Sequence, residues 1–203
     1  MVKSLVVAFS SCVLAGSALA AAAVGQPAPA FTATDTAGRS VSLADFKGKH
    51  VVLEWVNPGC PYVRKHYGAG NMQTTQKGAT AKGVVWLAVN STASEHGDHL
   101  KPAEMAAWMR QHGAAATATL MDESGQVGRA YGARTTPHMY VIDPAGTLVY
   151  AGAIDSKPSA DPADIPTATN HVNAALADTL AAKAVATPTS RPYGCSVKYS
   201  DAV

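Results

Sequence analysis

The hydrophobic positions of this chain fall into short continuous runs separated by amphipathic segments. Residues 50–56 (HVVLEWV) and 83–89 (GVVWLAV) are apolar with almost no alternation, which is typical of strands buried on both faces of a sheet. The segment between them has a helical composition broken by Gly-Ala-Gly-Asn, and its length fits a crossover between parallel strands. The two runs therefore predict the centre of an α/β sheet.

The remaining segments extend this pattern on both sides. Residues 31–49 alternate around a Thr-Ala-Gly turn and predict an N-terminal β-hairpin. Downstream, the sequence predicts a helix at 101–113, a strand at 117–122, a short helix at 125–133, two strands within 138–154, and a closing helix within 167–185. We expect an α/β fold with a mixed central sheet flanked by helices.

The first 20 residues have the pattern of a secretory signal peptide. Lys3 precedes an apolar run, and small residues follow that end in Ala18-Leu19-Ala20, the form that signal peptidase reads. The run is shorter than the roughly 18 residues that a membrane span needs. We expect cleavage after about Ala20, a periplasmic or secreted location, and no membrane span thereafter; a lipoprotein anchored through Cys12 is disfavoured.

Behind the signal peptide, the sequence predicts one domain over 24–185 and an extended C-terminal arm over 186–203. The arm has prolines and a glycine before its cysteine and no helical period. Removal of Lys3 with the signal peptide lowers the formal net charge of +2 by one, so the charge gives no reason to expect a nucleic-acid partner. The cysteines left are Cys60 and Cys195, in a compartment where disulfides persist.

Cys60 follows the first buried strand directly, and Pro61 suits the first position of a helix. A sulfur at a helix N-terminus faces unpaired backbone N–H groups, which lower a thiol pKa from about 8.5 to roughly 3.5–7.5. Arg64 lies on the same helical face and could add to the positive field. This placement favours a reactive thiol over a buried, inert cysteine.

With these residues the chain resembles the thioredoxin superfamily, in particular secreted oxidoreductases and redoxins of the TlpA and AhpC/TSA type. The resemblance runs from about residue 24 to 185 and includes the entry hairpin, the segment CPYVRK and the segment TTPHMYVIDPAGTLVYAG. It implies a thioredoxin-like fold with Cys60 as the attacking nucleophile. It also implies a cis bond before Pro137 that presents the backbone of Thr136 to an extended substrate strand.

Glu54 interrupts an otherwise apolar strand six residues before Cys60, where a lone buried carboxylate is costly. The resemblance implies that such an acid relays a proton for the resolving thiol, so we assign Glu54 as a general base with a pKa raised by desolvation. An ion pair with a nearby Lys or Arg carries about equal weight.

The chain also differs from the families that it resembles. Val63 stands where C-x-x-C proteins have their second cysteine, which excludes a local dithiol. Peroxiredoxins would show Thr or Ser, Pro and Arg where this chain has Asn57, Leu53 and Pro137, although Asn57 and Arg64 could partly substitute. The balance favours disulfide exchange over peroxide reduction.

Cys195 is the remaining candidate partner for Cys60. If the closing helix ends near Val185, ten residues of arm lead to Cys195 and span about 30 Å, enough to cross the domain. We expect Cys195 to resolve the oxidised or mixed-disulfide form of Cys60; the alternative is a permanent disulfide that pins the arm.

Other histidines and acids carry weaker signals. Glu95, His96, Asp98 and His99 could bind a metal, but a solvated loop is favoured, and we expect neither metal nor cofactor. His66 points to a different helical face from Cys60, and His138 faces either the site or the sheet.

The sequence therefore predicts a thiol oxidoreductase of the cell envelope. Its expected partners are a disulfide-bearing protein or a small disulfide or peroxide, together with an external thiol donor. We expect Thr136, Pro137, Pro61, Asn57 and Arg64 to contact the substrate. The alternatives are a peroxiredoxin-like thiol peroxidase and a non-catalytic binding module of the same fold.

Overall fold

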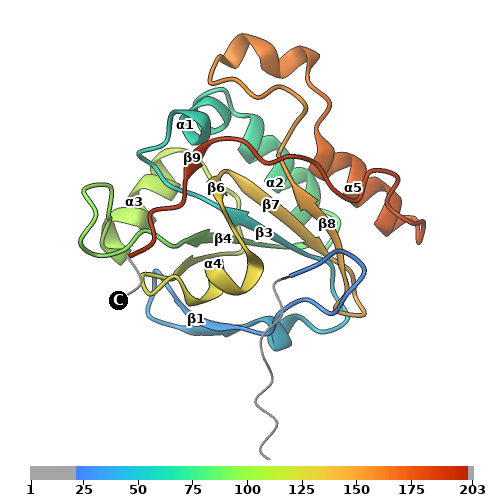
Figure 1. Ribbon diagram of the computed structural model, residues 1–203, viewed down its shortest axis with the longest axis horizontal. Coiled ribbons are helices and arrows are strands. Elements are labelled where there is room, and N and C mark those ends of the chain that lie inside the picture. Colours follow the sequence, from blue (N-terminus) through green and yellow to red (C-terminus); the bar gives the residue numbers. More distant parts are fainter. Residues whose placement is uncertain (1–21, 201–203) are drawn as a thin grey trace, which may run out of the picture.

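The computed structural model describes residues 22–200, built around a seven-stranded mixed sheet (Figure 1). Across the sheet the strand order is β2-β1-β5-β4-β3-β7-β8. Strands β3, β4 and β5 run parallel to one another, whereas β1, β2, β7 and β8 add antiparallel pairs at the two sides. The strands are β1 (Thr32–Asp35), β2 (Ser40–Ser42), β3 (Val51–Trp55), β4 (Val85–Asn90), β5 (Ala118–Met121), β7 (His138–Ile142) and β8 (Leu148–Gly152).

Helices connect these strands and cover the sheet. They are α1 (Pro61–Gly68), α2 (Asn71–Thr80), α3 (Pro102–Gln111), α4 (Gln126–Tyr131) and α5 (His171–Leu180), with short 3-10 helices at Leu43–Phe46 and Pro162–Thr167. The hairpin, the two buried strands and the order of helices and strands agree with the sequence predictions. One detail differs: the closing helix ends at Leu180 rather than near Val185. Before that helix, the Pro- and Asp-rich segment 155–167 contains a 3-10 helix.

Alternation along β3 divides the core into two layers. Val52 and Val56 point to the face covered by α1, α2 and α5, whereas Leu53 and Trp55 point to the face covered by α4 and the N-terminal segments. Glu54 shares the first face with Val52, so the chain places a carboxylate inside the layer that also holds Cys60. All five residues of β3 are buried, Glu54 included, as the apolar run around Glu54 predicts.

The C-terminal arm returns across the sheet instead of extending into solvent (Figure 1). It first crosses β8, where the Ala151 N–H donates to the Pro188 carbonyl at 3.1 Å. Its strand β9 (Cys195–Ser196) then pairs antiparallel with β6 (Thr135–Thr136), just before β7. Beyond β9, the Tyr199 hydroxyl donates to the Ala133 carbonyl at 2.8 Å. Anchors therefore hold the arm on both sides of Cys195.

Glycines mark the places where the arm passes closest to the domain. A Cβ at Gly152 would lie 2.7 Å from the backbone N of Ser190, and a Cβ at Gly128 would lie 2.7 Å from Cε1 of Tyr199. Both distances are shorter than real Cβ contacts allow, so a side chain at position 152 would displace the backbone of the arm, and one at position 128 would require the Tyr199 ring to shift.

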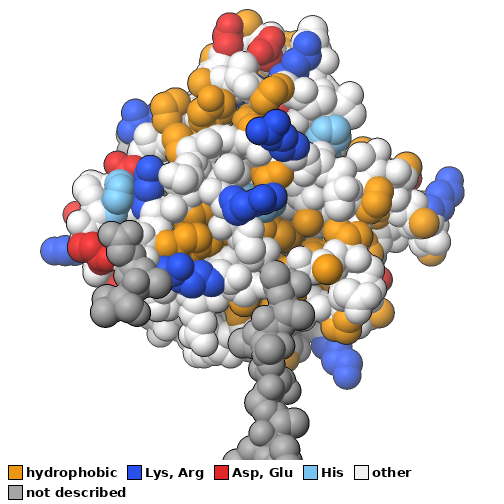
Figure 2. Space-filling model, in the orientation of Figure 1, with side chains coloured by type: hydrophobic (Ala, Val, Ile, Leu, Met, Phe, Trp, Pro, Cys, Tyr) orange, Lys and Arg blue, Asp and Glu red, His pale blue; other side chains and the backbone are white. Residues whose placement is uncertain are grey.

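No helix within residues 22–200 is long and apolar enough to cross a membrane. On the face shown in Figure 2, Lys and Arg side chains lie singly among hydrophobic and uncharged groups. This distribution agrees with the small net charge and offers no broad basic patch on that face.

A glycine substitution tests whether the arm is seated as described. Gly152→Ala should push the Ser190 segment off β8, because the contact is with backbone atoms that cannot rotate away. Limited proteolysis should then cleave the arm at least several-fold faster than in wild type. Gly78→Ala is the matched control, because nothing lies within 4 Å of its added Cβ and alanine favours a helix. Equal cleavage rates in the two variants would contradict this arm placement.

Candidate active site

Cys60 is the N-cap residue of α1, with Pro61 at the first helical position. Its backbone N–H donates to the Asn57 carbonyl at 3.0 Å, and its own carbonyl accepts the Arg64 N–H at 3.0 Å. These two bonds fix the turn from β3 into α1 and aim the sulfur along the free N–H groups of the first helical turn. The Cys60 side chain is 1% exposed, so the arm and the neighbouring loops cover it.

The structure brings Cys195 directly against Cys60. The two Sγ atoms lie 2.7 Å apart, so a disulfide bond between them would need little movement. The backbone of Cys195 pairs antiparallel with that of Thr136, and this pairing positions the Cys195 sulfur beside Cys60. Two residues that are 135 positions apart in the sequence therefore meet as a pair of sulfurs.

The two thiols have opposite pKa shifts. Burial raises the pKa of Cys60, but hydrogen bonds from Cys195 and from the Val63 backbone outweigh it, and the net shift is downward. Burial, the hydrogen bond to Cys60 and the negative charge of its thiolate raise the pKa of Cys195 to about 12. Cys60 is therefore the more acidic thiol of the pair, and Cys195 keeps its proton to higher pH.

Thr136 and Pro137 form the wall opposite the helix. The bond between them is cis, as the resemblance implied. The Thr136 carbonyl oxygen lies 3.1 Å from Cys60 Sγ, where it accepts a hydrogen bond only from the protonated thiol and so opposes the downward pKa shift. The backbone of Gly194 lies so close to this carbonyl that a side chain at position 194 would collide with it. Glycine thus lets the arm approach the cis-proline segment.

Asn57 and Arg64 stabilise the loop before Cys60. The Asn57 side chain accepts the Gly59 N–H at 2.7 Å and donates to Asp98 at 3.2 Å. Arg64 is exposed, and its Nε donates to the Pro58 carbonyl at 2.8 Å. Both side chains are thus engaged with the turn that carries the sulfur; their expected contacts with a substrate stay predictions.

Glu54 is fully buried and has three hydrogen-bond donors. Tyr67 donates to Oε1 at 2.8 Å, while Gln76 and Trp86 donate to Oε2 at 2.9 and 2.7 Å. Burial raises the pKa of Glu54, and these three bonds oppose that rise. No Lys or Arg pairs with it within residues 22–200, so the ion-pair alternative is wrong.

The two buried histidines belong to different clusters. His138 turns towards the sheet, where its Nδ1 lies 3.1 Å from the Tyr140 hydroxyl, and burial lowers its pKa to about 3. His66 lies on a different face of α1 from Cys60, and its Nε2 is 3.3 Å from the hydroxyl of Tyr193 on the arm. That hydroxyl also donates to Asp155. Sequence reasoning missed Tyr193 and Asp155, for which the only signal was that Tyr193 precedes Cys195 by two residues.

The loop at 95–99 shows no metal site. His96 and Asp98 are 4.0 Å apart and partly exposed, and His99 pairs with Glu123 at 2.9 Å. Within residues 22–200, no group of three or more His, Cys, Asp or Glu side chains is arranged to hold a metal ion.

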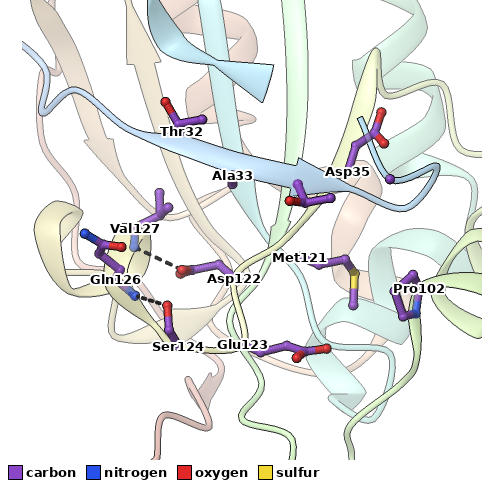
Figure 3. A pocket seen from close by; sticks show the side chains of 12 residues that line it. Thr32, Ala33, Asp35, Pro102, Met121, Asp122, Glu123, Ser124, Gln126 and Val127 are labelled. Atoms are coloured by element: carbon purple, nitrogen blue, oxygen red, sulfur yellow. Dashed lines mark hydrogen bonds between the residues drawn. The ribbon is translucent and has the colours of Figure 1, made fainter. Parts of the chain in front are cut away.

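A hollow of about 460 Å³ lies beside β1 and the start of α4, away from the cysteines (Figure 3). Its buried acid, Asp122, is already engaged, because it accepts the backbone N–H groups of Val127 at 3.1 Å and Gly128 at 2.9 Å. Among the residues that the structure describes, the hollow therefore offers no unengaged buried acid.

Comparison with known proteins agrees with this geometry. The sequence model of the AhpC/TSA family matches residues 24–151. The chain belongs to the AhpC/TSA family.

Individual relatives share this fold and parts of the sequence. The thiol-disulfide oxidoreductase ResA of Bacillus subtilis (strain 168) is 30% identical over 125 residues, which are 62% of this chain and 64% of that protein. An uncharacterized conserved protein from Geobacillus kaustophilus is 27% identical with a TM-score of 0.76, covering 89% of this chain and 94% of that one. A putative thiol:disulfide interchange protein DsbE from Chlorobium tepidum is 26% identical with a TM-score of 0.52, covering 64% and 85%. These similarities confirm the thioredoxin-like fold.

The raised pKa of Glu54 predicts a pH-dependent stability. The folded state holds the Glu54 proton more tightly than the unfolded chain, so this stabilisation is present below the ordinary pKa of 4.5 and is lost as the pH rises through the folded pKa. In Glu54→Gln the side chain cannot titrate. Its amide nitrogen would face two hydrogen-bond donors, which lowers the stability by the same amount at every pH. In urea unfolding, the stability difference should shift in favour of the variant between about pH 4.5 and pH 8. A constant difference would show that folding does not perturb this carboxyl group.

Proposed function

We propose that this protein is a thiol-disulfide oxidoreductase in which Cys60 is the nucleophile and Cys195 the resolving thiol. The observation that carries the proposal is the 2.7 Å approach of the two sulfurs, one with a lowered and one with a raised pKa. Membership of the AhpC/TSA family and the similarity to ResA support it. The segment resembling a signal peptide, outside the described residues, favours a place in the cell envelope.

The first chemical step joins Cys60 to the substrate. The Cys60 thiolate attacks one sulfur of a substrate disulfide, so that a Cys60–substrate bond forms, the substrate S–S bond breaks, and the departing thiolate takes up a proton. Because Cys60 is 1% exposed, the arm must move aside before this step. The substrate then occupies the space beside Thr136 and Pro137.

The second step returns the arm and releases the product. Once Cys60 is in the mixed disulfide, the negative charge that raised the pKa of Cys195 is gone. Cys195 can then lose its proton and attack Cys60 Sγ, forming the Cys60–Cys195 bond and releasing the second substrate thiol. Each turnover reduces one disulfide by two electrons and oxidises the two cysteines, and an external thiol donor reduces them again.

Glu54 is our candidate for the proton acceptor, because burial gives its carboxyl group a raised pKa within the same core layer as Cys60. A peroxidase is the less favoured activity. The Asn57 side chain, at the position where peroxiredoxins would carry a hydroxyl, is already bonded to Gly59 and Asp98.

Cysteine variants test the two roles separately. Cys195→Ser should accumulate a mixed disulfide between Cys60 and a model substrate such as oxidised glutathione, whereas Cys60→Ser should form none. Wild-type protein oxidised without reductant should give a Cys60–Cys195 peptide pair by mass spectrometry. A map without that linkage, within one chain or between two, would remove Cys195 as partner, and consumption of hydrogen peroxide with a supplied thiol but no disulfide turnover would favour the peroxidase.

The lowered pKa of Cys60 predicts a distinctive alkylation profile. Since the thiolate is the reactive form, iodoacetamide should modify Cys60 with a midpoint clearly below the roughly 8.5 of a free cysteine. In Cys195→Ser, a hydroxyl replaces the S–H donor, so the midpoint should shift while Cys60 stays reactive. A wild-type midpoint near 8.5 would mean that Cys60 is not an activated thiol.

A further inference from the structure

The arm is fastened near Cys195 by a buried polar cluster that the disulfide chemistry does not itself require. We call it the arm latch: Tyr193 on the arm, His66 on α1, and Asp155 just after β8. The Tyr193 hydroxyl contacts both partners, donating to Asp155 and lying 3.3 Å from His66 Nε2. Asp155 and His66 are 2% and 0% exposed, so the arm delivers one hydroxyl to two buried ionisable groups.

The hydrogen bonds of the latch run in one direction. The Asn71 amide nitrogen lies 2.8 Å from His66 Nδ1 and donates to it, which assigns the imidazole proton to Nε2. Nε2–H then donates to the Tyr193 oxygen, and the Tyr193 O–H donates to Asp155 Oδ1. Each of these side chains thus donates a hydrogen bond to the next, in the order Asn71, His66, Tyr193, Asp155. Loss of the Tyr193 hydroxyl would break two bonds at once.

Asp155 depends on the arm for part of its stabilisation. Its Oδ1 accepts from Tyr193 and from the Lys157 backbone N–H, whereas its buried Oδ2 has no hydrogen-bond partner and lies 3.9 Å from His66 Nε2. A buried carboxylate with one bare oxygen is costly. When the arm lifts, Asp155 loses its hydroxyl donor, so the latch favours the closed arm.

The ring of Tyr193 is also held. It packs edge-on against Tyr62 with centroids 5.8 Å apart, and the Lys65 ammonium lies 5.8 Å from its centroid. The arm forms one wall of a hollow of about 620 Å³ that also touches Thr135 and Asp155. Movement of Tyr193 would therefore open space continuous with the edge of β6, where Cys195 now pairs with Thr136.

We propose that Tyr193 is a positioning residue that holds Cys195 against Cys60 and, by the same contact, restricts access of substrates to Cys60. The inference rests on the proposed function, because it assumes that the two cysteines exchange. A latched arm gives Cys195 a high effective concentration near Cys60 and covers the nucleophile. Weakening the latch should therefore move two measurements in opposite senses: Cys60 becomes more accessible, and the Cys60–Cys195 bond becomes less favoured.

Tyr193→Phe tests this, because it keeps the ring and removes only the hydroxyl. In the reduced full-length protein, iodoacetamide should alkylate Cys60 several-fold faster than in wild type. In glutathione buffers, the equilibrium constant for the Cys60–Cys195 disulfide should fall by about twofold or more, because only the reduced protein can open the arm when the hydroxyl is missing. Asp155→Asn, which removes the charge but keeps the shape, is a second variant. It should likewise speed the alkylation of Cys60 and weaken the Cys60–Cys195 disulfide.

Tyr131→Phe is the matched control. Its hydroxyl donates to the Pro29 carbonyl at 2.8 Å on the other face of the sheet, so its loss should leave both measurements at wild-type values. Faster alkylation together with a weaker disulfide in Tyr193→Phe supports the proposal. Any other combination in a folded variant overturns it, as does failure of both latch variants to fold, because the cluster would then be structural.

The two proposals fail in different ways. If wild-type protein forms no Cys60–Cys195 disulfide, the proposed function is wrong, yet the alkylation rates still report whether Tyr193 covers Cys60. If wild type forms the disulfide and Tyr193→Phe behaves like wild type, only the latch is wrong.

Discussion

The pairing of the arm with the edge of β6 is the interaction on which the site depends. Two residue pairs, Thr135 with Ser196 and Thr136 with Cys195, fix the register that brings one sulfur over the other. Side chains alternate across a strand, so a shift of one residue would turn Cys195 away from Cys60. The close approach of Gly194 to Thr136 and the bond from the Val197 N–H to the Arg134 carbonyl secure this register from both sides.

The distant position of the second thiol changes which contacts would control the proposed redox pair. In a C-x-x-C motif the helix itself holds both sulfurs, whereas here 135 residues separate them and only tertiary contacts bring them together. Closing so long a loop covalently would contribute roughly 5 kcal/mol in the chain-entropy treatment, less whatever the reduced arm already retains. Because the reduced arm is already anchored by β6, Tyr193 and Tyr199, much of that ordering exists before the bond forms.

The sequence predicts some parts of this structure far better than others. The mostly apolar run at 50–56 and the Cys-Pro step after it are local patterns, so the buried strand, the helix start and the placement of Cys60 could all be predicted. Glu54 stood out as a lone acid, but its partners could not be read, because Tyr67, Gln76 and Trp86 come from three different elements. The end of the last helix was misjudged because alanines continue past Leu180 with good helix propensity, and Ala182 takes a positive φ of 56° instead. The path of the arm could not be predicted, because it depends on contacts with segments that are distant in the sequence.

The arm combines two functions that oppose each other in the proposed reaction. A resolving thiol works best when it is held close to its target, but a nucleophile under a closed arm meets no substrate. The arm is held by hydrogen bonds to and from its backbone and hydroxyl groups, each with a modest net contribution, and by a few partly buried side chains such as Tyr193 and Val197. Such a segment can open locally while the sheet stays folded, because its opening free energy is a fraction of the global one. The strength of the anchors around Cys195 therefore sets the balance between capture of a substrate and release of its product.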